Sequence, residues 1–167
     1  MNFSKLIDEI NIRIGRASAW LTLAMVLVTF FIVALRRVFD SGWIWLQESV
    51  TWMHAAVFML AAAYALARDE HVRVDIFYRG FSPRRKALVD AAGSLFLLLP
   101  VSVFLIWSSW DYVAASWSIR ESSREAGGLV FPFVPLLKSF IPIMSVMLML
   151  QAIGMLCRAI IDIRSTR

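Results

Sequence analysis

Four long stretches of this sequence contain no Asp, Glu, Lys or Arg, and they limit the possible folds more than any other feature. The stretches cover residues 17–35, 49–67, 91–110 and 139–157, and each is 19 or 20 residues long. A hydrocarbon core about 30 Å thick needs roughly 20 helical residues at about 1.5 Å each. A backbone in lipid must satisfy its own hydrogen bonds, so each stretch is predicted to be a transmembrane helix. The predicted fold class is an all-α integral membrane protein with four transmembrane helices.

Composition supports a membrane protein and excludes several classes of soluble protein. Of the 167 residues, 60% are hydrophobic, which leaves too little polar surface to cover a soluble core of this size. The one cysteine, Cys157, allows no internal disulfide and no cysteine-based metal site. The net charge of +5 does not indicate nucleic-acid binding, because the basic residues lie in the segments that flank the apolar stretches. We expect a single membrane domain over residues 1–167.

The distribution of Lys and Arg predicts the orientation in the membrane. Twelve of the 17 basic residues lie in segments 1–16, 68–90 and 158–167, and five lie in segments 36–48 and 111–138. Loops on the cytoplasmic side of a membrane carry the excess of Lys and Arg. Both termini and the connection 68–90 are therefore predicted to be cytoplasmic, and the loop 111–138 is predicted to lie on the outer side.

The segment before the first span has the pattern of an amphipathic helix. Its apolar residues recur at intervals of three, four and seven, at Phe3, Leu6, Ile7, Ile10 and Ile14. This spacing gathers them on one helical face, while the charged residues lie elsewhere on the wheel. We expect residues 1–16 to form a helix that lies in the inner membrane interface.

The connection 68–90 contains a helix start. Ser82 can cap a helix that begins at Pro83, because a proline at the first helical position loses no hydrogen bond. Such a start would hold three basic residues at the level of the lipid phosphates, namely Arg84, Arg85 and Lys86. Pro100 is expected to kink the third span.

The four spans contain few side chains that could catalyse a reaction or bind a substrate or cofactor. They contain no charged side chain of the kind that usually marks a transport or proton site, and their amide and imidazole groups are confined to Gln151 and His54. We expect His54 to be a hydrogen-bonded packing residue and Gln151 to bond between helices. A haem needs two His ligands on one iron, yet His54 and His71 would lie about 25 Å apart on one helix. We predict no catalytic, cofactor or metal site and no enzyme activity.

The second span and the segments around it resemble a known family of transport proteins. Glu48 stands at the outer start of this span, "AAAYALAR" at 61–68 forms its inner end, and "HVRVD" follows at 71–75. The stretch "ESSREAGGLVFPFVPLLKSFIPI" at 121–143 and the later Gln151 add to the likeness. The chain resembles the small permease subunit (DctQ-like, Q-type) of tripartite ATP-independent periplasmic (TRAP) transporters. It departs from many members in having Gln47 in place of a second acidic residue, and Ala61 in place of glycine.

The resemblance implies a role in a multi-subunit transporter of the bacterial inner membrane. Such a small subunit associates with a large multi-span permease that holds the substrate and coupling-ion sites, while a periplasmic binding protein delivers an organic acid. The small subunit would have no transport site of its own. It would act as a scaffold while the transport domain of the large subunit moves like an elevator.

The charged residues around the second span are the candidate interface. We expect the inner cluster of Arg68, His71, Arg73 and Asp75 to bind phospholipid headgroups and the large subunit, because Arg binds phosphate and carboxylate with two-pronged geometry. Glu48 and Trp52 are candidates for subunit contact on the outer side. The simpler interpretation of the inner cluster is a solvated, positively charged cytoplasmic loop.

Two other functions remain open from the residues alone. The chain could be an independent small transporter or channel that works as a homo-oligomer, although its spans lack a polar pore lining. It could also be a membrane cytochrome or the membrane subunit of a quinone-linked enzyme. A flux assay with the purified chain and a visible absorption spectrum would separate these alternatives from the scaffold subunit.

Overall fold

The computed structural model describes residues 3–70 and 78–165, and within these residues the regular structure is entirely helical. The helices are α1 (Phe3–Phe39), α2 (Ile44–Ala67), α4 (Pro83–Gly93), the π-helical turn η1 (Ser94–Leu98), α5 (Leu99–Ser118) and α6 (Phe133–Ser165). Because α4, η1 and α5 follow one another without a break, the described residues form four long helices that are apolar enough to cross a membrane. The predicted fold class of an all-α protein with four membrane-spanning helices is confirmed.

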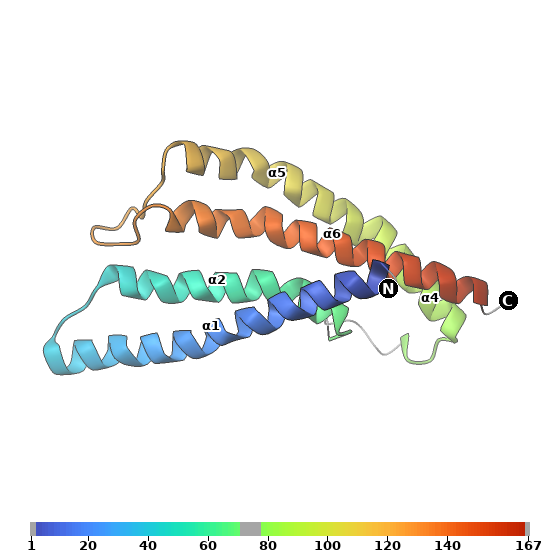
Figure 1. Ribbon diagram of the computed structural model, residues 1–167, viewed down its shortest axis with the longest axis horizontal. Coiled ribbons are helices and arrows are strands. Elements are labelled where there is room, and N and C mark those ends of the chain that lie inside the picture. The colour runs from blue at the N-terminus through green and yellow to red at the C-terminus, as the bar shows by residue number, and fades with distance from the viewer. Residues whose placement is uncertain (1–2, 71–77, 166–167) are drawn as a thin grey trace.

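The helices form two hairpins that lie side by side (Figure 1). Helix α1 packs against α2, α2 against α6, and α6 against α5, so α2 and α6 occupy the middle. The first part of α1 crosses over to α6, and α4 packs on α6 as well. Figure 1 shows the two chain termini toward one end, which we name the inner end. The opposite end, with residues 40–43 and 119–132, is named the outer end.

Helix α1 differs from the expected pair of separate segments. It runs for 37 residues, about 55 Å at 1.5 Å per residue, so the segment 1–16 continues into the first span without a break. Its buried side chains are Ile7, Asn11 and Ser18, in line with the buried Gly15. The predicted apolar face contributes Ile7 to this packing, and the rest of it points outward, with Ile10 48% exposed. This face is available to lipid, and its placement in the membrane interface stays a prediction.

The third span begins as its sequence indicated. Ser82 accepts a hydrogen bond from the N–H of Arg85, and Pro83 occupies the first turn of α4. The irregularity expected at Pro100 takes the form of the π-helical turn η1 just before it, where the Leu99 N–H reaches back to the carbonyl of Ser94. A proline has no N–H and its ring crowds the preceding turn, so a widened turn relieves that strain.

Helices α5 and α6 approach closely through a row of serines. Four residues of the third span at intervals of seven or eight are almost completely buried, namely Ser94, Ser102, Ser109 and Ser116. The hydroxyls of Ser102 and Ser109 donate to carbonyls of their own helix, whereas the buried hydroxyl of Ser94 has no hydrogen-bond partner among the described residues. Small side chains at an interface let helix backbones come near each other, which favours packing in lipid.

Candidate functional site

Two polar clusters connect the hairpins, one at each end of the molecule. The inner polar cluster consists of Asp8 and Asn11 of α1 with Gln151 and Arg158 of α6. Asn11 Nδ2 donates to Gln151 Oε1 at 2.8 Å, and Gln151 Nε2 donates to Asp8 Oδ1 at 2.8 Å. Arg158 Nη1 donates to Asp8 Oδ2 at 2.7 Å. Gln151 is fully buried, so its amide can find partners only within this cluster.

Helix positions explain why these four side chains meet. Asp8 and Asn11 are three residues apart, and Gln151 and Arg158 are seven apart, so each pair lies on one helical face. The approach of α1 to its neighbours also depends on Gly15. A Cβ at this position would lie 2.4 Å from Tyr64 Cβ of α2, a separation that real side chains do not reach. The sequence alone predicted a helix-to-helix bond for Gln151, and the structure shows its partners.

The outer polar cluster is centred on Glu48. Its Oε1 accepts from the hydroxyl of Ser123 at 2.5 Å, and its Oε2 accepts from the backbone N–H of Leu129 at 2.6 Å. A backbone bond from Trp45 to the carbonyl of Gly127 runs beside it. Gly128 leaves room for the carboxylate, since a Cβ there would lie 2.7 Å from Glu48 Oε2. Glu48 thus fixes the loop 119–132 to the start of α2.

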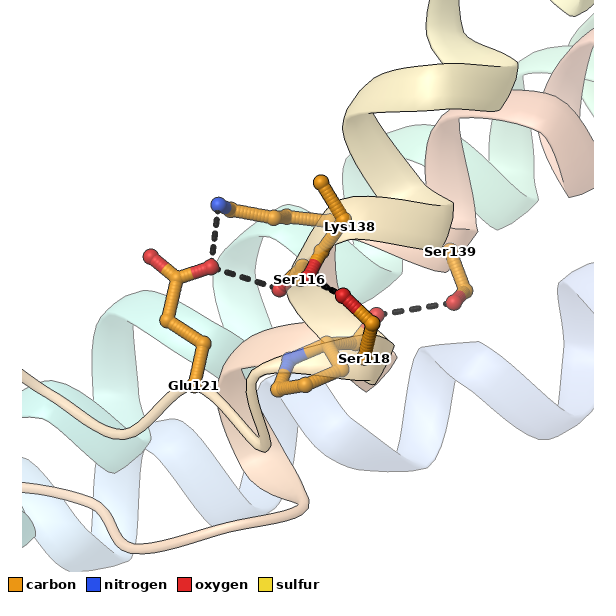
Figure 2. Close-up of polar contacts among 7 residues, drawn as sticks. Ser116, Ser118, Glu121, Lys138 and Ser139 are labelled. Atoms are coloured by element: carbon orange, nitrogen blue, oxygen red, sulfur yellow. Dashed lines mark hydrogen bonds and ion pairs between the residues drawn. The ribbon is translucent and has the colours of Figure 1, made fainter.

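A second group of contacts holds the same loop to the other hairpin. Figure 2 shows Glu121 of the loop reached by Ser116 of α5 and Lys138 of α6. Ser116 Oγ donates to Glu121 Oε2 at 2.6 Å, Lys138 Nζ donates to the same oxygen at 2.5 Å, and the ammonium lies 4.1 Å from the ring centroid of Tyr112. The hydrogen bond from Lys138, followed by the one from Ser116, lowers the pKa of the Glu121 carboxyl below its ordinary value.

Trp52 completes the outer end as a link between α2 and α6. Its Nε1 donates to the carbonyl of Phe133 at 2.9 Å, and its ring meets Phe140 edge-on with centroids 5.2 Å apart. Glu48 and Trp52, both candidates for contact with another subunit, therefore make contacts within the chain. Their interactions set the shape of the outer surface, which includes the loop 119–132.

The basic candidates at the inner end are spread out. Arg68 ends α2 and is exposed, 3.7 Å from the carboxylate of Glu70. Arg84 and Arg85 are exposed at the start of α4. Lys86 lies 5.4 Å from the ring centroid of Tyr78, a cation–π contact. The remaining members of the predicted inner cluster lie outside the described residues, namely His71, Arg73 and Asp75.

A cavity of about 490 Å³ opens at the inner end between α2, α4 and α6. Side chains of both charges line it, including Asp90, Lys86 and the paired Asp8 and Arg158. It is the open side of the inner polar cluster. Within residues 3–70 and 78–165, no group of three or more His, Cys, Asp and Glu side chains is placed to hold a metal ion.

Comparison with known proteins agrees with this architecture. Residues 25–162 match the model of the family described as tripartite ATP-independent periplasmic transporters, DctQ component. The chain belongs to this family. A curated relative, the C4-dicarboxylate TRAP transporter small permease protein DctQ of Vibrio cholerae serotype O1, is 29% identical over 89 residues. That alignment covers 53% of this chain and 38% of the relative.

Membership in this family confirms the resemblance seen in the second span and the outer loop. The chain is a small membrane subunit of a TRAP transporter and a multi-pass protein of the bacterial inner membrane. The matched residues include the outer polar cluster and the α6 half of the inner one, with Glu48 and Gln151. The α1 half of the inner polar cluster, Asp8 and Asn11, lies before them.

Proposed function

We propose that this chain is the stationary scaffold of a TRAP transporter for an organic acid and has no transport site of its own. The observation that carries the proposal is the pair of polar clusters at opposite ends, which join the two hairpins into one unit. A support for a moving partner must hold its shape while that partner works. Hydrogen bonds that are buried and fully paired resist separation, because each group left unpaired costs about 1–3 kcal/mol.

The partners follow from the transporter class and from the surfaces of the chain. A large elevator-type permease would bind in the membrane, where the helices expose many large apolar side chains such as Phe58. A periplasmic binding protein would approach the outer loop 119–132. Both termini and residues 68–90 would be cytoplasmic, with Arg68, Arg84 and Arg85 close to phospholipid phosphates. The relative from Vibrio cholerae is named for C4-dicarboxylates, which supports an organic acid as the substrate.

A reversible disulfide across the inner end tests whether α1 and α6 stay in contact during transport. An ideal Cβ on Gly154 lies 3.7 Å from Ser4 Cβ, within the range that a disulfide bridges. The variant Ser4→Cys with Gly154→Cys, built on Cys157→Ser, would lock α1 to α6. Proteoliposomes that contain the large permease and the locked chain should retain uptake after oxidation. Loss of uptake on oxidation, restored by a reductant, would show that the two helices move apart during transport.

The same system separates the scaffold from an independent transporter. The purified chain alone should produce no flux of the organic acid in liposomes, whereas the complex with the large permease and the binding protein should. Omitting the small chain should lower recovery of active large permease. Flux from the small chain alone would overturn the proposal.

A further inference from the structure

Two residues in the uncharged stretches carry an amide or imidazole side chain, and they differ in burial and in hydrogen bonding. Gln151 of α6 is fully buried and bonded to Asn11 and Asp8. His54 of α2 is exposed, and within residues 3–70 and 78–165 no group exchanges a hydrogen bond with its imidazole. The sequence had led us to expect a hydrogen-bonded packing residue at this position.

His54 belongs to a stripe on the outward face of α2. Gln47, Thr51, His54 and Phe58 follow at intervals of four, three and four residues, and all four are exposed. We name the three polar members, Gln47, Thr51 and His54, the α2 stripe. On the opposite face of this helix, Ala56 is completely buried. Since α2 lies between α1 and α6, the stripe runs along the middle of the molecule rather than along its edge.

The depth of His54 makes its exposure costly. It lies six residues beyond Glu48, about 9 Å along the helix, and ten residues into a helix that spans Ile44–Ala67. Lipid at this depth offers no hydrogen-bond partner. An exposed serine can satisfy itself by bonding a carbonyl of its own helix, as Ser108 does with Leu105. The His54 imidazole makes no such bond within the part of the chain that the structure describes, and polar residues at this depth usually face another protein element.

We propose that the α2 stripe is the surface on which this chain docks the large permease, with His54 bonded to a polar side chain or free backbone carbonyl of that partner. The proposal rests on the proposed function, because it assumes a large membrane partner. Membership in a family of tripartite transporters supplies a membrane partner whose polar groups can meet such a stripe. A second copy of this chain would have to pair the stripe with itself. The outer polar cluster, one residue from Gln47 in sequence, would keep this surface in place.

A photo-crosslinking amino acid at position 54 tests the contact directly. The matched control is position 29, since Thr29 is exposed on α1 and lies seven residues before Arg36, at a comparable depth. The chain is co-expressed with the large permease of the same transporter and irradiated in membranes. An adduct with the large permease from position 54, and a much weaker one from position 29, is expected. A homodimer adduct, adducts with lipid alone, or equal yields at both positions would overturn the proposal.

Substitutions give a second and independent measurement. His54→Leu suits lipid but cannot form a hydrogen bond, and it should weaken co-purification of the large permease roughly three- to thirtyfold. His54→Gln keeps a donor and an acceptor and should restore most of the recovery, while Thr29→Leu should leave it unchanged. If the wild-type chain recovers the large permease and His54→Leu does so equally well, the docking surface is wrong. If the wild-type chain recovers no large permease, the proposed function itself fails.

Discussion

Replacing Gln151 with leucine gives the sharpest test of the inner polar cluster. The Gln151 side chain is fully buried and forms two hydrogen bonds of 2.8 Å, to Asn11 and to Asp8. Leucine fills a similar volume, so the change removes the bonds without opening a large cavity. The Asn11 amide, only 2% exposed, would lose its acceptor and could not turn to solvent. Since an unpaired buried group costs about 1–3 kcal/mol, the free energy of unfolding should fall by about that amount.

A second substitution separates this cause from a general loss of packing. Asn11→Leu together with Gln151→Leu removes the unpaired amide, while Asp8 keeps its bond to Arg158 at 2.7 Å. The double variant should therefore be more stable than the sum of the two single effects predicts, with a coupling of about 0.5–3 kcal/mol. Unfolding of all four proteins in one detergent, followed by tryptophan fluorescence, measures the cycle. Strictly additive single effects would refute the interpretation of the cluster as one hydrogen-bonded unit.

Three further predictions concern the close contacts and the outer loop. Gly15→Ala would force a Cβ into Tyr64 of the facing helix and should lower stability by about 1–3 kcal/mol, whereas Gly93→Ala, with nothing within 4 Å, should not. Gly128→Ala should push apart the outer polar cluster, so trypsin should cut the outer loop faster. The pKa of Glu121 lies below its ordinary value of 4.5, so its stabilising contribution is complete above that pH and is lost as the pH falls through the folded pKa. Glu121→Gln should therefore reduce the loss of melting temperature between about pH 6 and pH 3.

The membrane-spanning helices could be predicted because the bilayer imposes a length and forbids unpaired charge. The charge-free stretch 49–67 lies within α2 (Ile44–Ala67), and the capped start at Ser82 and Pro83 lies where local chemistry placed it. The helices extend past the charged residues, so the outer loop occupies 119–132 rather than 111–138. A helix ends where its backbone bonds end, and a charged residue such as Asp111 can remain helical at the membrane surface.

The polar clusters could not be predicted, because their members are far apart in the sequence. Asp8 and Gln151 are separated by 143 residues, and the sequence around either residue does not indicate that the other is its partner. The first segment also carries a polar residue beside its apolar ones, since Asn11 lies four residues after Ile7. The apolar spacing was the stronger signal and indicated a helix lying flat in the interface. The structure packs Asn11 and the neighbouring Ile7 against α6 and leaves Ile10 exposed, because in lipid a polar side chain needs a partner and an apolar one does not.

The two polar clusters supply an attraction between the hairpins that apolar packing in lipid does not. In the most apolar 18-residue segment of each of the four helices, only 6% to 28% of the residues are buried. Packing between helices is therefore limited along these segments. Lipid tails are as apolar as the side chains, and burying one against another therefore gains little. Small-residue contacts, such as Ser102 of α5 against α6, bring neighbouring helices together. Polar bonds at the inner and outer ends join the hairpins, and their ionic members Asp8, Arg158 and Glu48 lie outside the uncharged stretches. His54 lies inside one of these stretches, where the proposed docking of the large permease would supply its bond.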